Sequence, residues 1–342
     1  MQETQQNVEY SVVAEGLCKS YGAVKAIDNV SFKIAKGEIL GFLGPNGAGK
    51  STTMRILSGL MPATSGRAYV CGVSVANNPK LAQSHIGYMP ENNPLPEDVR
   101  VVEYLKFRAA IKGLKGREIR EAVEEVMDVC QLQRKASRKI IGNLSKGFKQ
   151  RVGIADALLG KPEVVIMDEP TIGLDPHQII AIRELIDSLR GKMSVVISSH
   201  ILPEIELVCD RVMIINHGMV VASGTPETLR SEFLPVDTYK IVASAELDEV
   251  RAAAAASGID FEVGQTSPKD ADGFASYALK TRRRGAFGDA LIKEFAKHPN
   301  MKLRELYLAR PTLEDIFMAA TRRSWEEKRE SIFGAKNQEA KK

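Results

Sequence analysis

The sequence predicts an α/β protein with a mainly parallel central sheet, followed by a smaller α+β domain. Between about residues 10 and 230, short β-rich runs alternate with helical stretches. Two of these runs, "VVIM" (164–167) and "SVVIS" (194–198), are apolar throughout, as is typical of strands that are buried on both faces of a parallel sheet. The length of 342 residues fits two domains better than one.

The elements of the larger domain follow in order along the chain. Strands are expected at 10–22, 37–44, 163–170, 193–200 and 211–218, and a helix is expected at 179–190. The stretch of about 93–150 breaks this alternation, because "VVEYLKFRAAIKGL" (101–114) and "REIREAVEEVMDVCQL" (117–132) read as amphipathic helices with charged outer faces. We therefore predict a helical subdomain within a larger domain that spans 1–233.

A second domain is predicted at 234–322, after a proline-containing linker at 231–237. Its pattern is strand, helix, strand, strand, helix, strand, with one more helix, at 238–244, 247–257, 259–266, 275–283, 285–298, 301–309 and 312–323. This βαββαβ order is that of a ferredoxin-like domain, and an irregular appendage is the alternative. The charged tail, 323–342, is expected to be a solvated helix or disordered.

Composition excludes several classes of protein. The net charge is only +4, from 47 basic and 43 acidic residues, so charge indicates neither a nucleic acid nor a strongly acidic partner and by itself leaves the partner open; no nucleic acid is expected. No apolar run approaches the ~18 residues of a membrane span, and the polar N-terminus does not read as a signal peptide. The four cysteines are widely spaced without C-x-x-C, which favours reduced thiols in a cytosolic protein over disulfides or a zinc site.

A glycine-rich loop lies between an apolar run and a helical stretch. Its residues are Gly44, Pro45, Asn46, Gly47, Ala48, Gly49, Lys50, Ser51 and Thr52. Glycines let backbone N–H groups surround phosphate oxygens, and the next helix adds the positive end of its dipole. Lys50 is expected to reach the terminal phosphates and Ser51 to bind Mg²⁺. A glycine-rich turn without a ligand is the structural alternative.

Two carboxylates end the apolar strand of "EVVIMDEP". Asp168 and Glu169 stand at the carboxyl end of this strand, where ligands of parallel sheets bind. Asp168 is expected to hold Mg²⁺ and Glu169 to polarise the attacking water, for which it must come within hydrogen-bond reach. The alternative is a pair of solvated carboxylates. His200 ends the neighbouring apolar strand, and Tyr21 lies in "KSYGAVKAI"; taken alone, each reads as an ordinary surface or packing residue.

Taken in order, these motifs resemble the ATP-binding subunits of ABC transporters over about residues 10–230. The matching segments are Tyr21 (the adenine-stacking aromatic), "GPNGAGKS" (Walker A), "YMPE" (the Q-loop position), "LSKGFKQR" (the signature), "VVIMDEP" (Walker B), "GLDP" (the D-loop) and "SSH" (the switch histidine). The resemblance implies the fold of a P-loop NTPase ABC cassette with a mixed sheet core and a helical subdomain. It also makes Tyr21 and His200 expected site residues.

The chain departs from the family pattern at two motifs. Glu91 stands where the family usually has the Q-loop glutamine; a carboxylate can accept from a metal-bound water but cannot donate as an amide does. The usual LSGGQ signature is "LSKGF", which keeps Ser145 and Gly147 but has Lys146 and a phenylalanine in place of glycine and glutamine. With "PENNPL" and "RPTLEDIF", these departures look most like exporter-type ATPases of gliding motility and of copper or drug export.

The resemblance implies a function and partners. ATP and Mg²⁺ would lie between two copies of the chain, with Ser145, Lys146 and Gly147 contacting the partner's ATP and Asp175 connecting the two sites. Hydrolysis would drive export through separately encoded permease subunits, and the chain would be peripheral on the cytoplasmic face of the inner membrane. Two rivals are a soluble ABC-type ATPase acting on ribosomes or DNA, and a non-hydrolytic regulatory protein. Two cassettes or a long coiled coil would mark the first; one Walker A motif and no heptads are present.

The signature segment poses an electrostatic question. Ser145 reads as a helix N-cap, so Lys146 and Lys149 fall in or beside the first turn of a helix, where a cation is disfavoured by about 0.3–1 kcal/mol unless an anion lies nearby. The expected anion is the γ-phosphate held by the partner. For the second domain, a ligand-binding module and a dimer or permease-docking module both stay open; the basic residues 282–284 would meet lipid or permease, or simply solvent.

Overall fold

The computed structural model describes residues 10–133, 136–283, 285–298 and 301–322. Contacts divide them into two units: the first takes the described residues up to Pro226 together with 320–322, and the second takes Glu227–Ala319. The boundary lies a few residues before the expected one at 233/234. The predicted charged tail, 323–342, lies outside the described residues.

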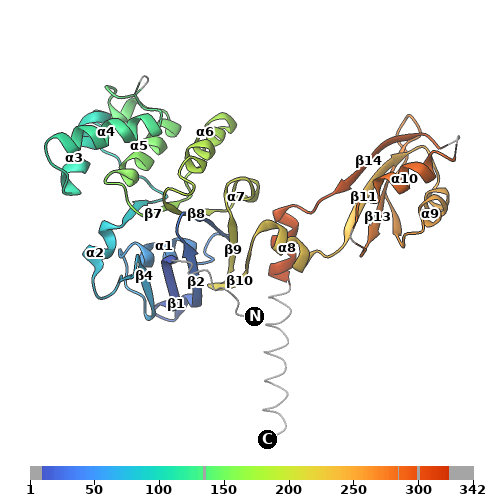
Figure 1. Ribbon diagram of the computed structural model, residues 1–342, viewed down its shortest axis with the longest axis horizontal. Coiled ribbons are helices and arrows are strands. Elements are labelled where there is room, and N and C mark those ends of the chain that lie inside the picture. Colours follow the sequence, from blue (N-terminus) through green and yellow to red (C-terminus); the bar gives the residue numbers. More distant parts are fainter. Residues whose placement is uncertain (1–9, 134–135, 284, 299–300, 323–342) are drawn as a thin grey trace, which may run out of the picture. The chain divides into compact units, whose positions relative to one another are not determined.

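The first unit has a six-stranded sheet that is parallel except at one edge (Figure 1). Its strands, in spatial order, are β10 (Met219–Gly224), β9 (Arg211–Asn216), β3 (Ile39–Leu43), β8 (Ser194–Ser199), β7 (Val164–Asp168) and β6 (Ile86–Met89). Only β9 and β10 pair in antiparallel fashion. Every residue of β3, β7 and β8 is buried, which explains their continuous apolar runs.

A second, antiparallel sheet belongs to the same unit. Its order is β2 (Val24–Ala35), β1 (Tyr10–Tyr21), β4 (Ser65–Val70) and β5 (Val73–Ser74). Helix α1 (Lys50–Leu57) contributes Met54, Ile56 and Leu57 to one apolar cluster with residues of both sheets. The phosphate-loop helix is therefore anchored in the core of the unit.

The remaining helices of the first unit include the predicted helical subdomain. They are α2 (Pro79–Ser84), α3 (Val101–Ile111), α4 (Arg117–Val129), the 3₁₀ turn η1 (Ile141–Asn143), α5 (Lys146–Leu158), α6 (Pro176–Asp187) and α7 (Leu202–Val208). Figure 1 shows α3, α4 and α5 gathered together, as the amphipathic patterns predicted. Helix α8 (Pro226–Phe233) begins at the boundary of the units.

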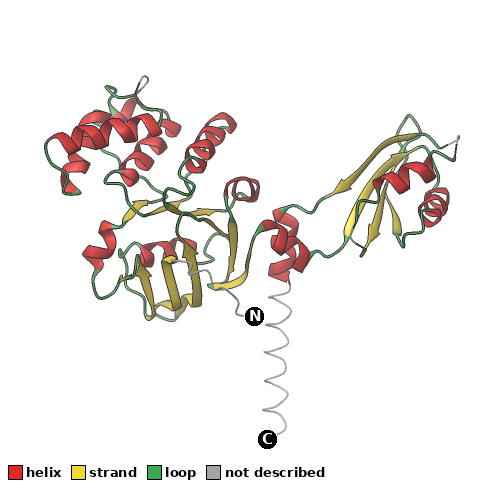
Figure 2. Ribbon diagram, viewed as in Figure 1, coloured by secondary structure: helices red, strands yellow, loops and turns green. Residues whose placement is uncertain are grey.

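The second unit has its elements in the order strand, helix, strand, strand, helix, strand, which is the βαββαβ order predicted from the sequence. Its antiparallel sheet runs β12 (Glu262–Ser267), β13 (Ala275–Thr281), β11 (Asp237–Ala243) and β14 (Leu303–Ala309). Helices α9 (Leu247–Ala256) and α10 (Gly288–Phe295) pack on one face of this sheet, around Tyr239, Ile241, Leu279 and Phe295 (Figure 2). A helix follows at 313–322.

The expected linker is shorter than predicted. Helix α8 continues through Phe233, and β11 begins at Asp237, so only 234–236 connect them. Leu234 precedes Pro235, and a residue before proline is disfavoured in the helical region, so the helix ends where the sequence requires. None of the four cysteines, all of which lie in the described part of the chain, forms a disulfide. No helix in the described part of the chain is long and apolar enough to cross a membrane.

Candidate nucleotide site

The phosphate loop connects β3 to α1 at the carboxyl edge of the parallel sheet. Gly47 and Gly49 have φ of +78° and +106°, which glycine adopts without steric cost. At Gly44, a Cβ would lie 2.3 Å from the carbonyl oxygen of Ile215, so a larger residue does not fit there. The loop therefore depends on its glycines, while its apex, 45–47, is exposed.

Lys50 is the first residue of α1 and is only 6% exposed. Its Nζ donates to the carbonyl oxygen of Gly44 at 2.7 Å and lies 3.6 Å from Oε1 of Glu169. A buried ammonium needs such partners, because an unpaired buried charge is very costly. Ser51 and Thr52 are half-buried in the first turn, where backbone N–H groups have no intrahelical acceptor.

The carboxylates after β7 form a connected polar cluster. Asp168 and Glu169 are 1% and 5% exposed. The Ser198 hydroxyl of β8 donates to Oδ1 of Asp168 and accepts from the Glu169 backbone N–H at 2.9 Å. Oε2 of Glu169 lies 2.8 Å from Nδ1 of His200. The structure thus brings Lys50, Asp168, Glu169 and His200 together, as expected from the sequence.

The donor set of this site suits a hard cation. Asp168 is a buried carboxylate that makes no ion pair with the basic side chains of the described residues, and one of its oxygens accepts from a neutral hydroxyl. Carboxylate and hydroxyl oxygens are the ligand types that Mg²⁺ prefers. Asp168 and the Ser51 hydroxyl therefore fit this ion by their chemistry.

Sequence reasoning missed two further contacts of the cluster. Ser198 is one. The other is Glu204 on α7, whose carboxylate accepts from the hydroxyl of the buried Thr171. Burial raises the pKa of Glu204, and the charge of Glu169 raises it further, against the hydrogen bond from Thr171. The charge of Glu169 therefore reaches Glu204 on α7.

The signature segment begins α5, with Ser145 as its N-cap residue. The position is as predicted, but the Ser145 side chain makes no capping hydrogen bond and is exposed. The two lysines find neighbours within the same unit: Lys149 Nζ lies 3.2 Å from Oε1 of Glu97, and Lys146 Nζ lies 2.3 Å from where a Cβ of Gly173 would stand.

Gly147 lies in the first turn of α5, and Asp175 is the N-cap residue of α6. A Cβ at Gly147 would lie 2.3 Å from Oε1 of Gln178, so the Gln178 side chain of α6 lies against Gly147 of α5. Asp175 caps α6 by accepting from the Gln178 backbone N–H at 3.0 Å. Ser145, Lys146 and Asp175 are all exposed. The signature and the D-loop therefore lie beside each other on one surface.

Among the described residues, no hydrogen bond or ion pair joins Tyr21 or Glu91 to the cluster of Lys50, Asp168, Glu169 and His200. Tyr21, at the end of β1, is 48% exposed; its hydroxyl lies 2.9 Å from the Met61 sulfur. Glu91 is exposed in the loop after β6. Burial raises the pKa of Tyr88 on β6, with a further contribution from Asp168 and a smaller one from Glu91, so this loop lies within electrostatic range of the carboxylates.

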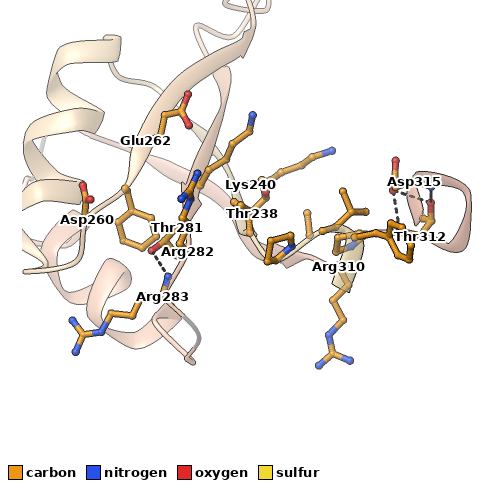
Figure 3. Close-up of a pocket in the computed structure, with 18 of the residues that line it drawn as sticks. Thr238, Lys240, Asp260, Glu262, Thr281, Arg282, Arg283, Arg310, Thr312 and Asp315 are labelled. Carbon is orange, nitrogen blue, oxygen red and sulfur yellow. Dashed lines mark hydrogen bonds between the residues drawn. The ribbon is translucent and has the colours of Figure 1, made fainter. Parts of the chain in front are cut away.

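The second unit has an open hollow lined by charged side chains, including Lys240, Arg282, Arg283 and Arg310, together with Asp260 (Figure 3). The figure shows the guanidinium groups of Arg283 and Arg310 pointing away from each other. These charges do not converge on one point. The predicted basic run 282–284 is exposed at 282 and 283, and residue 284 lies outside the described residues.

A glycine-rich loop, a buried lysine at the start of the next helix and paired carboxylates at the end of a neighbouring parallel strand define a nucleotide-binding site of the P-loop class. Comparison with known proteins specifies the family. The family model described as "ABC transporter" matches residues 27–172. Nod factor export ATP-binding protein I of Rhizobium sp. (strain N33) is 36% identical over 228 residues, which cover 66% of this chain and 74% of that protein. The chain therefore belongs to the ABC transporter family, as an ATP-binding protein and ATPase.

Other relatives and solved structures agree with this assignment. The linearmycin resistance ATP-binding protein LnrL of Bacillus subtilis (strain 168) is 39% identical over 219 residues, 64% of this chain and 70% of that protein. A solved ATP-binding subunit of an ABC transporter has a TM-score of 0.59 and 33% identity, covering 65% of this chain and 92% of that one. A dimeric ATP-binding cassette, MJ0796, bound to ADP and Pi in a post-hydrolysis state, has a TM-score of 0.58 and 25% identity over 63% of this chain and 98% of that one.

Proposed function

We propose that this chain is the ATP-hydrolysing subunit of an ABC exporter, that two copies close on two ATP molecules, and that separate permease subunits carry the exported compound across the membrane. The chain would act at the cytoplasmic face of the membrane as a peripheral subunit. The observation that carries the hydrolytic part is the position of Glu169, a buried carboxylate held between Lys50 and His200 at the carboxyl edge of the sheet.

The residues of the loop and of β7 take distinct roles in this proposal. Lys50 leaves its partners at the loop carbonyl and Glu169 to meet the terminal phosphates, while the loop N–H groups bind their oxygens. Asp168 and Ser51 hold Mg²⁺, which neutralises phosphate charge. Glu169 orients and polarises the attacking water, and His200, 43% exposed, contacts that water or the γ-phosphate.

The remaining site residues act at the edges of the site. Tyr21 stacks on adenine with its exposed ring, and Glu91 replaces the Q-loop amide as an acceptor for a metal-bound water. Ser145, Lys146 and Gly147 face the ATP held by a second copy, and Asp175 lies between the two sites. The exposed surface shared by the starts of α5 and α6 supports this arrangement.

The export direction rests on relatives. One relative is named as a Nod factor export ATP-binding protein and another as a linearmycin resistance ATP-binding protein. No observation favours the ribosome or DNA alternative. The exporter reading requires a permease in a separate chain, which co-purification of the full-length protein from detergent-solubilised membranes would recover.

Glu169→Gln tests the hydrolytic role. The amide keeps the size of the side chain but cannot take up a proton, so kcat for ATP hydrolysis should fall by roughly 10²- to 10⁴-fold while ATP still binds. Lys50→Ala should instead lose nucleotide affinity, measured by equilibrium binding of a labelled ATP. Glu184→Gln is the matched control, because this exposed carboxylate of α6 lies outside the site. Wild-type turnover by Glu169→Gln would contradict the proposal.

The second unit is proposed as an accessory domain of about 234–322 that follows a cassette of 1–233. Deleting 235–342 and measuring ATPase activity with and without permease separates two roles for it. Loss of dimerisation would favour a dimer module, and loss of coupling alone would favour permease docking. Unchanged dimerisation and coupling would exclude both.

A further inference from the structure

Three potential metal-binding side chains meet at the edge of the parallel sheet opposite the nucleotide site. Cys71, His85 and Glu163 each place one donor atom within 4.8 Å of the other two donor atoms. Nδ1 of His85 lies 3.1 Å from Oε2 of Glu163. The three residues are far apart in the sequence, so the fold alone brings them together. Cys71 and His85 are half-buried and Glu163 is exposed, which leaves the cluster open to water and ions.

Backbone pairing holds two of these residues side by side. Val164 donates to the His85 carbonyl oxygen at 3.0 Å, and Ile86 pairs with Val164 where β6 and β7 begin. His85 and Glu163 therefore occupy the amino-terminal ends of adjacent parallel strands. Their relative position is determined by the sheet and does not depend on flexible loops.

The third residue stands in a tight turn. Cys71 and Gly72 join β4 to β5, with φ of +48° and +78° between the paired residues Val70 and Val73. Such two-residue turns prefer Asn-Gly or Asp-Gly, because both positions need positive φ. A cysteine seldom adopts a positive φ, so its presence at this position suggests a role for the thiol. The Cys71 N–H donates to the Ser11 carbonyl oxygen at 2.8 Å, which fixes the turn against β1.

Thiolate, imidazole and carboxylate together are the ligand types of Zn²⁺. Two ligands about 2.0–2.1 Å from one tetrahedral ion are about 3.3 Å apart, close to the observed His85–Glu163 separation of 3.1 Å. A sulfur ligand at about 2.3 Å would lie about 3.5 Å from the nitrogen, and the donor atoms lie within 4.8 Å of one another, so closing the cluster needs a shift of about 1.3 Å at most. Three protein ligands leave the fourth position for water.

We propose that Cys71, His85 and Glu163 form a binding site for one Zn²⁺ ion, separate from the nucleotide site. Glu163 precedes β7, whereas Asp168 ends it; the five residue steps from one to the other span about 16 Å. The bound ion joins the β4–β5 turn of the antiparallel sheet to the strand that carries Asp168. The two sheets of the first unit would then be connected by metal ligation as well as by their apolar core.

Co²⁺ serves as a spectroscopic probe for this site. The full-length protein, freed of metal by chelation and kept without nucleotide in excess Mg²⁺, is titrated with Co²⁺ and then with Zn²⁺. We expect one Co²⁺ per chain with a thiolate charge-transfer absorption, displaced by one Zn²⁺. Cys71→Ser should abolish that absorption. Each of Cys71→Ser, His85→Gln and Glu163→Gln should weaken Zn²⁺ binding more than about 10-fold, because even an outer-shell partner is worth about 10- to 100-fold.

Matched controls are available in the same unit. Cys18→Ser removes a half-buried thiol and His177→Gln an exposed imidazole, and both should bind Zn²⁺ within about twofold of the wild type. Circular dichroism of the metal-free variants checks their fold, and the exposed Glu163→Gln remains informative if Cys71→Ser does not fold. A wild type without thiolate absorption, or an absorption that persists in Cys71→Ser, would overturn the site and leave an ordinary His85–Glu163 hydrogen bond.

Discussion

Ser198 provides the sharpest test of how the carboxylates are positioned. Its hydroxyl is wholly buried, donates to Asp168 and accepts from the Glu169 N–H at 2.9 Å. Ser198→Ala removes both bonds at once. Leaving a buried N–H without its acceptor costs about 1 kcal/mol, and removing a donor to a buried carboxylate costs about 2 kcal/mol, so the free energy of unfolding should fall by about 3 kcal/mol.

The same substitution should affect catalysis more than binding. The phosphate loop and Lys50 are untouched, so KM for ATP should stay nearly constant. Displacement of Asp168 and Glu169 should lower kcat on the order of 10- to 100-fold, since misplacement by about 1 Å costs that much in a positioned site. Urea unfolding followed by circular dichroism gives the stability, and steady-state phosphate release gives kcat and KM.

The neighbouring hydroxyl on β8 is the control. Ser199 is also buried, but its hydroxyl accepts only from the Ile201 N–H at 2.9 Å in the described structure. Ser199→Ala should cost about 1 kcal/mol of stability and leave kcat within about twofold. If Ser198→Ala and Ser199→Ala behave alike in both assays, Ser198 does not position the carboxylates.

Two further predictions concern lysines. In a Glu169→Gln background, Lys146→Glu should weaken ATP-dependent dimerisation and leave ATP binding by the monomer nearly unchanged, because the changed charge acts only on the partner's phosphates. Sedimentation measures the amount of dimer. Equal amounts of dimer with and without Lys146→Glu would mean that Lys146 faces solvent. Burial lowers the pKa of Lys112, whose Nζ donates to carbonyls at the end of α5, to about 8 from 10.5. Between these values the unfolded chain holds the extra proton, so the free energy of unfolding should rise with pH. Lys112 as a whole residue is exposed, so solvent screens its charge and the rise should be on the order of 1 kcal/mol. Denaturation series from pH 7 to 10.5 should show this rise, and Lys112→Met should remove it.

Much of the fold could be predicted because its signals are local. The buried strands β7 and β8 are continuous apolar runs, and the loop glycines precede a helix with Lys50 at its start. Helix α5 begins after Ser145, as a serine before an apolar-periodic stretch indicates. The βαββαβ order of the second unit likewise follows from alternating patterns and turns. Each of these features is written within a short window of the sequence.

The contacts that complete the site depend instead on the register in which neighbouring strands pair. Asp168 pairs with Ser198 in the parallel ladder of β7 and β8, and this pairing directs the Ser198 hydroxyl to the carboxylates while Ser199 faces elsewhere. "SSH" contains two adjacent serines, and a register shift of one residue would exchange their faces. The Thr171–Glu204 contact joins the turn after β7 to helix α7, which are also distant in the sequence. No local pattern specifies either contact.

The glycine of the signature motif, Gly147, has two separate physical explanations. In the sequence, Gly147 is explained by close approach to a partner's phosphate. In the structure, a Cβ at this position would already lie 2.3 Å from the Gln178 side chain of the same chain, so a larger residue would displace that side chain without any nucleotide. Substituting Gly147 therefore changes a contact within the monomer as well, which makes it a less specific test of the shared site. Lys149, paired with Glu97, is likewise accounted for within the chain. The exposed Ser145 and Lys146 are the positions whose substitution reports on the partner.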